Sequence, residues 1–271
     1  MPHLRSNGIA VYYEDHGSGE PLILIMGFTV SSIGWRWNIS AFAQDFRTIA
    51  FDNRGVGQSD KPDAPYSMAM FADDTVGVLD GLGIDQAHVF GISMGGMIAQ
   101  EFALRYPRRV KTLVLGCTNC GGVQTVLSKD PEVLNLLANV ESMDVQQAAL
   151  TMTKVAVTPW FMQRHMDVLL QFNQLSLQHP TPQHGMVRQM QAIQGHDTYE
   201  RLPQITMPTL VITGKEDGLV PPENSVTLAR CIPNADLAIL SNASHLFNVE
   251  LPETMAETVK GFIRRRREWM G

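Results

Sequence analysis

The sequence predicts an α/β fold, with one mostly parallel central sheet flanked by helices. Two observations predict it. Short apolar runs alternate along the chain with longer stretches of helical periodicity, which is the pattern of parallel strands joined by crossover helices. At 271 residues, with 44% hydrophobic and 18% charged residues, the chain is also long enough for one large domain with a buried core.

The N-terminal segment predicts a β-hairpin over residues 3–13, with Asn7-Gly8 at its turn, because this dipeptide favours tight two-residue connections. Six further strands are expected at residues 22–26, 48–51, 88–92, 110–115, 209–213 and 237–240. Helical patterns lie between most of them, for example at residues 68–82 and 222–230. These elements lie before and after the middle of the chain, which has a different pattern.

The alternation stops between about residues 119 and 203. This interval is rich in Gln, Met and Leu and predicts about four helices, at residues 131–140, 145–155, 160–172 and 181–194. An insertion after the sixth strand would lie over the carboxyl ends of the strands. We therefore expect residues 1–118 and 204–271 to form the core domain and residues 119–203 a helical cap. The same apolar spacing would also describe additional core helices.

The segment Phe90-Gly91-Ile92-Ser93-Met94-Gly95-Gly96 places a serine between two glycines where an expected strand turns into a helix. Such a turn holds its central residue in a strained conformation, and the glycines let neighbouring segments approach closely. The Ser93 hydroxyl would then stand at the carboxyl end of the sheet, beside main-chain N–H groups. The pattern also occurs by chance in loops, but the strand and helix around it predict a nucleophile.

A serine hydroxyl needs a base, and a group that orients the base, before it can attack. Of the eight histidines, His245 lies in a small polar loop after the expected strand 237–240. Parallel sheets present catalytic groups on loops of this kind. His245 is therefore the predicted base. His196 is the next candidate for a functional role, as a hinge or pocket-lining residue.

The orienting carboxylate is expected after the strand 209–213, where Glu216 and Asp217 compete. Asp217 is favoured, because a shorter side chain beside Gly218 suits a fixed contact with the imidazole. An acid after the preceding strand is disfavoured, since no carboxylate follows it before Asp130.

The chain order Ser93, Asp217, His245 is that of an α/β-hydrolase, and the chain resembles this superfamily over essentially its whole length. It is most similar to the branch of small serine esterases and 3-oxoadipate enol-lactonase-like lactonases. Four blocks carry the resemblance: residues 22–28 with Trp35 downstream, residues 52–59, the Ser93 turn with residues 96–100, and residues 214–221 together with His245.

The resemblance implies an oxyanion hole made by the main-chain N–H groups of Phe28 and Met94, and it favours Asp217 as the acid. Many family members carry a histidine where this chain has Met26, which changes the shape and polarity of that loop but not its main-chain donors. Members that act as haloalkane dehalogenases or epoxide hydrolases use an aspartate nucleophile. Ser93 occupies that position here, which argues against those reactions.

Aromatic and sulfur-containing side chains predict an apolar pocket for a substrate with a small or medium apolar part. The residues expected to bind substrate are Gly27, Trp35, Trp160, Phe161 and Met166. A strongly anionic substrate would need an inward-facing cation, and the middle segment offers only Lys154, Arg164 and Arg188 before Arg201.

We therefore expect a hydrolase that cleaves a carboxylic ester or lactone through an acyl-enzyme on Ser93, with no metal and no organic cofactor. Three alternatives remain open. A C–C bond hydrolase acting on a dienoic diketone and a cofactor-free perhydrolase would use the same three residues. A non-catalytic small-molecule receptor would reuse the scaffold alone.

The composition bears on partners and location. The formal net charge is −6 with a pI near 5.7, and no basic cluster is interleaved with aromatics, so a nucleic-acid partner is not expected. No stretch approaches the roughly 20 apolar residues of a membrane span. Three cysteines and the absence of an apolar N-terminal segment favour the cytoplasm. A homo-oligomer is compatible with the sequence, which does not determine the oligomeric state.

Overall fold

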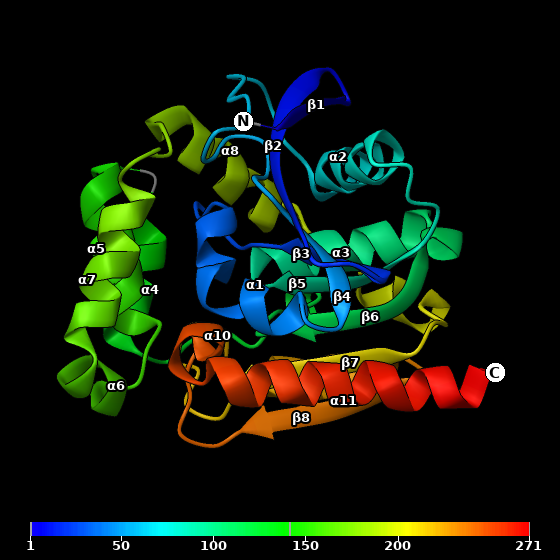
Figure 1. The fold of residues 1–271 in the computed structure, drawn as a ribbon. Helices are drawn as coiled ribbons and strands as arrows, with labels where there is room; N and C mark the ends of the chain where they lie inside the picture. The colour runs from blue at the N-terminus through cyan, green and yellow to red at the C-terminus, as the bar shows by residue number, and fades with distance from the viewer. Residues whose placement is uncertain (1, 141, 271) are drawn as a thin grey trace.

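An eight-stranded sheet forms the centre of the molecule (Figure 1). The structure, a computed structural model, describes residues 2–140 and 142–270. The strand order is β1-β2-β4-β3-β5-β6-β7-β8; β1 and β2 pair antiparallel, as do β2 and β4, and all later pairs are parallel. The predicted fold class is confirmed. The strands are β1 His3–Ser6, β2 Ile9–His16, β3 Glu20–Ile25, β4 Phe46–Phe51, β5 Ala87–Ile92, β6 Val110–Gly116, β7 Thr209–Gly214 and β8 Ala235–Leu240.

The predicted N-terminal hairpin forms around a two-residue turn. Ser6 pairs with Ile9, and Asn7 and Gly8 between them both have positive φ angles, of 44° and 82°. Asparagine and glycine adopt this left-handed conformation more readily than other residues, which explains why the turn lies where the sequence predicts it.

Helices cover both faces of the sheet because its central strands are buried on both sides. Along β3, Leu22 and Leu24 pack into one hydrophobic cluster, whereas Ile23 and Ile25 pack into another, as the two-residue period of a strand requires. The first cluster lies beneath α1 and α11, and the second beneath α2 and α3. The flanking helices are α1 Arg36–Phe42, α2 Met68–Gly81, α3 Met94–Arg105, α9 Glu223–Cys231, α10 Phe247–Glu250 and α11 Pro252–Met270, with 3₁₀ turns η1 Ser32–Trp35, η2 Pro107–Arg109, η3 Gly122–Gln124 and η4 Tyr199–Gln204.

The described part of residues 119–203, which we call the cap, contains five α-helices rather than the predicted four. The segment expected as one helix at residues 160–172 is divided at His165, whose backbone (φ −129°, ψ 36°) is not helical. The His165 ring stacks on Phe161, with 4.7 Å between ring centroids. In Figure 1, α4 to α7 form a group beside the sheet, and α8 lies between that group and the core. The cap helices are α4 Pro131–Asn139, α5 Val145–Val155, α6 Pro159–Arg164, α7 Met166–Ser176 and α8 Gln183–Gln194.

None of the helices in the described residues has both the length and the apolar composition needed to cross a lipid bilayer.

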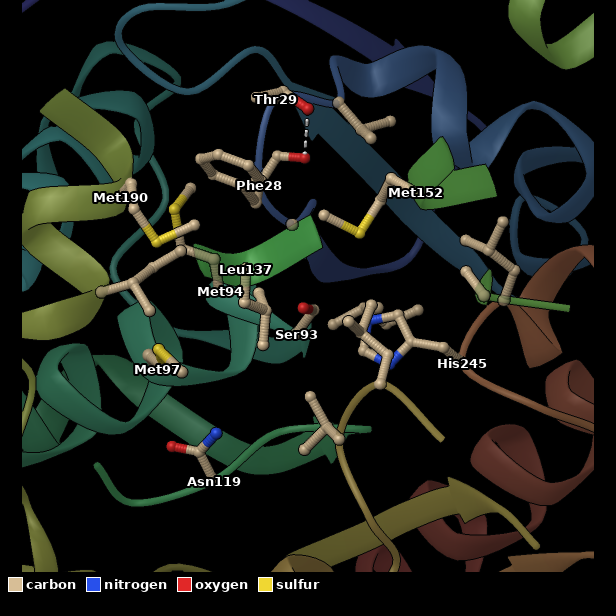
Figure 2. A pocket seen from close by; sticks show the side chains of 18 of the residues that line it. Phe28, Thr29, Ser93, Met94, Met97, Asn119, Leu137, Met152, Met190 and His245 are labelled. Atoms are coloured by element: carbon tan, nitrogen blue, oxygen red, sulfur yellow. Dashed lines mark hydrogen bonds between the residues drawn. The ribbon is translucent and has the colours of Figure 1, made fainter. Parts of the chain in front are cut away.

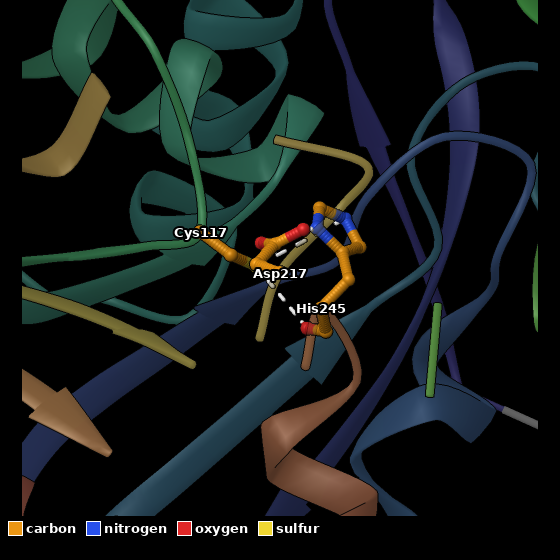
Figure 3. A group of neighbouring side chains, drawn as sticks. All are labelled: Cys117, Asp217 and His245. Carbon is orange, nitrogen blue, oxygen red and sulfur yellow. Dashed lines mark hydrogen bonds and ion pairs between the residues drawn. The ribbon is translucent and has the colours of Figure 1, made fainter. Parts of the chain in front are cut away.

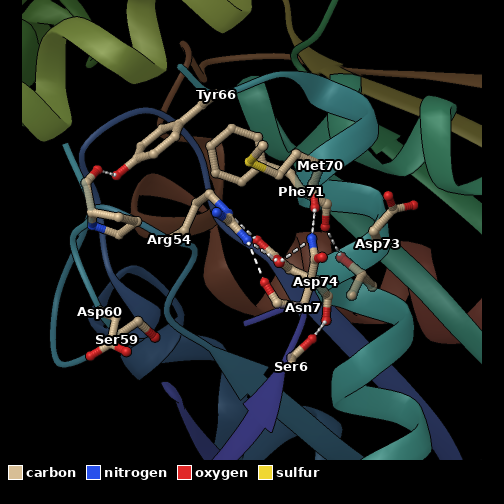
Figure 4. Close-up of polar contacts among 12 residues, drawn as sticks. Ser6, Asn7, Arg54, Ser59, Asp60, Tyr66, Met70, Phe71, Asp73 and Asp74 are labelled. Atoms are coloured by element: carbon tan, nitrogen blue, oxygen red, sulfur yellow. Dashed lines mark hydrogen bonds and ion pairs between the residues drawn. The ribbon is translucent and has the colours of Figure 1, made fainter. Parts of the chain in front are cut away.

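A buried ion pair fixes the loop after β4 to helix α2 (Figure 4). Arg54 donates through Nε and Nη2 to the two carboxylate oxygens of Asp74, each at 2.6 Å, and both side chains are almost fully buried. Asn7 in the hairpin turn donates to Asp74 Oδ1 at 3.1 Å, and the Arg54 guanidinium lies 5.7 Å from the centre of the Tyr66 ring. The hairpin, the loop after β4 and α2 are therefore connected through one carboxylate.

We predict that Asp74→Asn lowers the free energy of unfolding by about 3–5 kcal/mol, because it leaves the Arg54 charge buried without a counter-ion. Urea unfolding followed by circular dichroism would measure the change. Asp80→Asn is the matched control on the same helix, since Asp80 pairs with Arg109 at the surface and a pair of that kind contributes at most about 1 kcal/mol. Equal losses for the two variants would contradict the importance of the buried pair.

Candidate active site

Ser93 lies at the junction of β5 and α3 in a left-handed backbone conformation, with φ 58° and ψ −122°. The glycines on either side make the junction sterically allowed. A Cβ on Gly91 would overlap the main chain of Gly95, and a Cβ on Gly95 would overlap the carbonyl of Ile25 in β3. The Ser93 N–H donates to Gly116 O at 2.8 Å and so continues the sheet up to the turn. The structure has the strand-turn-helix geometry that the sequence predicts here.

Asp217 and His245 form a buried pair on the loops after β7 and β8. His245 Nδ1 is 2.9 Å from Asp217 Oδ2, and the other carboxylate oxygen accepts the main-chain N–H groups of Leu219 at 3.0 Å and Val220 at 2.8 Å. Three donors therefore hold the carboxylate, which in turn orients the ring. Glu216, the competing candidate, is exposed to solvent, and the hydrogen bond to the ring comes from Asp217.

The environment of His245 has two opposing effects on its pKa. Burial of the ring disfavours its charged form and lowers the pKa, whereas the Asp217 carboxylate stabilises that form. The carboxylate, together with the neighbouring Cys117 sulfur, outweighs burial, so the pKa of His245 stands well above its ordinary value of 6.5.

Cys117, which directly follows β6, lies close to Asp217 and His245 (Figure 3). Its Sγ donates to the carbonyl oxygen of His245 at 3.3 Å and lies 4.0 Å from Nε2. Burial raises the pKa of this thiol and keeps it protonated, so it serves as a donor. The side-chain atoms of Cys117, Asp217 and His245 that could ligate a metal ion lie within 4.8 Å of one another. All three residues already take part in the hydrogen bonds described above. The sequence analysis did not identify this contact.

Ser93 and His245 line the same cavity and lie next to each other in Figure 2. In this structure the two side chains are not hydrogen-bonded to each other. Contacts between a nucleophile and its base are commonly long in the absence of substrate and shorten when substrate binds.

The sequence predicts that the main-chain N–H groups of Phe28 and Met94 serve as oxyanion donors. Both residues line the cavity, and neither N–H has a hydrogen-bond partner within the described part of the chain. Thr29, the next residue, has a positive φ of 58°, and its N–H donates to Gln189 Oε1 on α8 at 2.8 Å. Gln189 is fully buried and donates in turn to Arg54 O at 3.1 Å. A cap glutamine therefore holds the loop that carries Phe28.

A second polar side chain connects the cap with the loop that carries His245. Glu250 accepts the N–H of Ser244 at 2.6 Å and the N–H of Thr158 in the cap at 2.7 Å, and Leu246 N donates to Ala156 O at 2.8 Å. Sequence reasoning identified neither Gln189 nor Glu250. Gln189 lies in a glutamine-rich helix, and no motif distinguishes it from its neighbours.

The cavity above Ser93 has a volume of about 350 Å³ and lies between the core loops and the cap. Its wall is mainly apolar and rich in thioethers (Figure 2). Among the described residues, none that lines it is Asp, Glu, Lys or Arg. The side chains that define it include Phe28, Met94, Met97, Leu137, Met152, Phe172 and Met190, with Asn119 and His196 among the polar ones.

Four of the five residues expected to bind substrate do not line this cavity; Gly27 does. Trp35 is fully buried in the core and packs on Phe90, with 4.9 Å between ring centroids. Trp160 and Met166 are 54% and 47% exposed, whereas Phe161 is buried in a small cluster between the cap and the segment around α10. These placements correct the prediction: the apolar residues of α6 and early α7 face away from the nucleophile.

Comparison with known proteins gives consistent results. Residues 20–252 match the family model of the alpha/beta hydrolase fold. The chain is 32% identical to a putative carbamate hydrolase RutD of Azorhizobium caulinodans, over 97% of this chain and 98% of the relative. It is 30% identical to a 2-hydroxymuconate semialdehyde hydrolase of Pseudomonas putida, over 94% and 91% of the two chains. The enol-lactonase of Burkholderia xenovorans LB400 superposes with a TM-score of 0.87, at 26% identity over 97% of this chain and 100% of the other. The chain therefore belongs to the α/β-hydrolase superfamily and is a hydrolase.

Proposed function

We propose that this hydrolase cleaves a carboxylic ester or lactone whose acyl part is apolar and uncharged, through an acyl-enzyme on Ser93. One arrangement carries the proposal: a strained serine, a histidine held by a buried carboxylate and two unpartnered main-chain N–H groups share one cavity. Similarity to an enol-lactonase supports the same reaction class.

In the proposed reaction, neutral His245 takes the Ser93 proton through Nε2 as the hydroxyl oxygen attacks the carbonyl carbon. Asp217 keeps the ring oriented and stabilises its charged form. The imidazolium then protonates the leaving alcohol, and the C–O bond breaks to give the acyl-enzyme. A water molecule, deprotonated by the same ring, attacks the acyl carbon; the acid leaves and Ser93 recovers its proton.

The N–H groups of Phe28 and Met94 would stabilise the oxyanion of each tetrahedral intermediate. Each donor contributes roughly 3–4 kcal/mol of transition-state stabilisation in comparable sites. Because these donors belong to the main chain, Met26 in place of the family's histidine leaves them in place. The contact from Gln189 to Thr29 supports the conformation of the loop that presents Phe28.

The charge of the cavity wall supports a neutral substrate. The cap cations that an anionic substrate would need have other partners: Lys154 pairs with Glu132 at 2.9 Å and Arg188 pairs with Asp63 at 3.0 Å. Arg164 lies over the ring of Trp160, at 5.3 Å from its centre. Placing a carboxylate in a mainly apolar cavity without a counter-ion costs several kcal/mol.

A C–C bond hydrolase with the same three residues is the second candidate, favoured by the similarity to a 2-hydroxymuconate semialdehyde hydrolase. A panel of aryl esters, lactones and dienoic diketones assayed with one preparation separates the two. The proposal expects the highest kcat/KM on esters or lactones, and a higher value on a diketone would replace it with the second candidate.

We expect Ser93→Ala to lower kcat on p-nitrophenyl butyrate by roughly three orders of magnitude or more, because the nucleophile is gone while binding remains. A fluorophosphonate probe should label the wild-type protein at Ser93, as located by peptide mass spectrometry, and should not label the variant. Ser128→Ala, at another serine of the cavity wall, is the control that should retain labelling. Full ester turnover by Ser93→Ala would refute the assignment.

The activity should depend on pH through His245. The ring acts as a base only when neutral, and Asp217 raises its pKa, so kcat/KM should fall as the pH drops through an apparent pKa above 6.5. Asp217→Asn removes the stabilising charge; it should shift this apparent pKa downward and lower kcat by roughly four orders of magnitude. A pH profile of the two proteins on one neutral ester provides the measurement. An unshifted profile would show that another group controls the activity.

The enzyme should discriminate strongly between neutral and anionic substrates. We predict that p-nitrophenyl hexanoate is hydrolysed with a kcat/KM at least about 100-fold above that of the p-nitrophenyl monoester of adipic acid, whose acyl chain has the same length and ends in a carboxylate. Converting that carboxylate to its neutral methyl ester should restore most of the rate. Equal rates for the charged and neutral substrates would contradict the proposed uncharged pocket.

A further inference from the structure

Thr29, in the loop that follows β3, has a backbone conformation that its side chain disfavours. Its φ angle is 58°, in the left-handed region. A β-branched residue rarely adopts this conformation, because its side chain crowds the main chain, and it persists only where the surrounding structure holds it. One contact within the loop contributes: the Thr29 hydroxyl donates to Phe28 O at 2.8 Å (Figure 2).

The same loop packs directly against the nucleophile. A Cβ on Gly27 would lie 3.0 Å from Ser93 Cβ and 3.5 Å from Ser93 Oγ. Phe28, between Gly27 and Thr29, carries one of the two N–H groups that the proposed mechanism assigns to the oxyanion. Because the segment is short, a rotation about the backbone of Thr29 would displace this N–H relative to Ser93.

Two cap side chains bond to the main chain of Thr29. Gln189 Oε1 accepts the Thr29 N–H at 2.8 Å, and the Thr181 hydroxyl donates to Thr29 O at 3.0 Å. Both side chains are buried. Thr181 lies two residues before the start of α8, and Gln189 lies within it. One segment of the cap therefore bonds to both polar main-chain groups of the residue with the disfavoured backbone.

Helix α8 is itself held firmly against the core. A Cβ on Gly185 would lie 2.6 Å from Gly55 O, so the helix and the loop after β4 meet at main-chain distance. Gln189 also donates through Nε2 to Arg54 O at 3.1 Å in that loop. The two cap contacts with Thr29 therefore come from a helix whose position is fixed by other contacts.

We propose that Gln189 and Thr181 are positioning residues for catalysis: they hold Thr29 in its left-handed conformation and thereby orient the Phe28 N–H toward the oxyanion. The inference rests on the proposed function and deepens it, because it makes the rate of acyl transfer depend on the cap. Neither residue is among the described residues that line the cavity above Ser93, so both act through the loop rather than by contact with substrate.

Gln189→Met removes both hydrogen bonds of the amide with little change in side-chain volume. Misplacing a catalytic group by about 1 Å can cost about 100-fold in rate. We therefore expect kcat on p-nitrophenyl butyrate to fall by about 10- to 100-fold, with KM within about 3-fold of the wild-type value. Thr181→Val removes a single hydroxyl and should lower kcat by about 3- to 10-fold, the range for one neutral hydrogen bond.

Gln191→Met is the matched control for this comparison. Gln191 lies two residues further along α8 and is exposed to solvent, so the variant should keep the wild-type kcat. A Gln189→Met protein that keeps the wild-type kcat, or that changes only in KM, would overturn the inference.

Glycine at residue 29 separates the proposed role from a general loss of packing. Glycine adopts positive φ angles without a steric cost, so the loop of Thr29→Gly needs less support from the cap. In the Thr29→Gly background, Gln189→Met should lower kcat by no more than about 3-fold, because the two changes act on one contact and are not additive. A loss as large as the one in the wild-type background would show that Gln189 does not act by holding Thr29.

Hydrogen exchange tests the two cap contacts without any turnover. In Gln189→Met, peptides spanning residues 26–31 should exchange at least about 10-fold faster than in the wild-type protein, whereas peptides from β6 should not change. Faster exchange confined to the loop supports the cap contacts even if no ester proves to be hydrolysed, a result that would refute only the proposed function. Unchanged exchange in a protein with normal esterase activity would overturn the inference and leave the proposed function intact.

Discussion

The backbone of Ser93 adopts a left-handed conformation that costs about 1–3 kcal/mol, and the surrounding structure must maintain it. Close packing maintains it: β5 is hydrogen-bonded into the sheet up to Ser93 N, and α3 begins at the next residue. Only glycine fits at residues 91 and 95, where the main chain of the turn meets itself and β3. The hydroxyl is therefore held at the sheet edge by the fold itself, and the other groups of the site need only to be placed around it.

The groups around Ser93 are placed jointly by core and cap. Gln189 connects α8 with both the loop at Thr29 and the loop at Arg54, and Arg54 is itself fixed by the buried pair with Asp74. Glu250 joins the loop before His245 to the start of α6. The cap helices thus bear on the geometry around the nucleophile as well as on the shape of the cavity. A displacement of α8 would disturb the residue next to Phe28, and a displacement of α6 would disturb the loop before His245.

The sequence predicted the fold class, the hairpin turn and the side chains that come together near Ser93 because local signals specify them. Glycine spacing, a turn dipeptide and polar loops after β-branched runs each have one dominant structural explanation. The cavity wall was not predictable in this way. Helical periodicity shows which residues share a face but not which face meets the core, so Trp160 and Met166 were assigned to the wrong side. Gln189 and the Cys117 contact with His245 depend on segments far apart in the chain, and no local pattern reports them.

Among the described residues, five methionines line the cavity, at residues 26, 94, 97, 152 and 190, and they have a chemical consequence of their own. Peroxides and peracids convert thioethers to sulfoxides, which are polar and bulkier than the side chains they replace. An enzyme that released peracid at Ser93 would oxidise its own binding surface at every such escape and would progressively lose affinity for apolar acyl groups. The thioether wall therefore suits chemistry in which water, rather than hydrogen peroxide, takes up the acyl group.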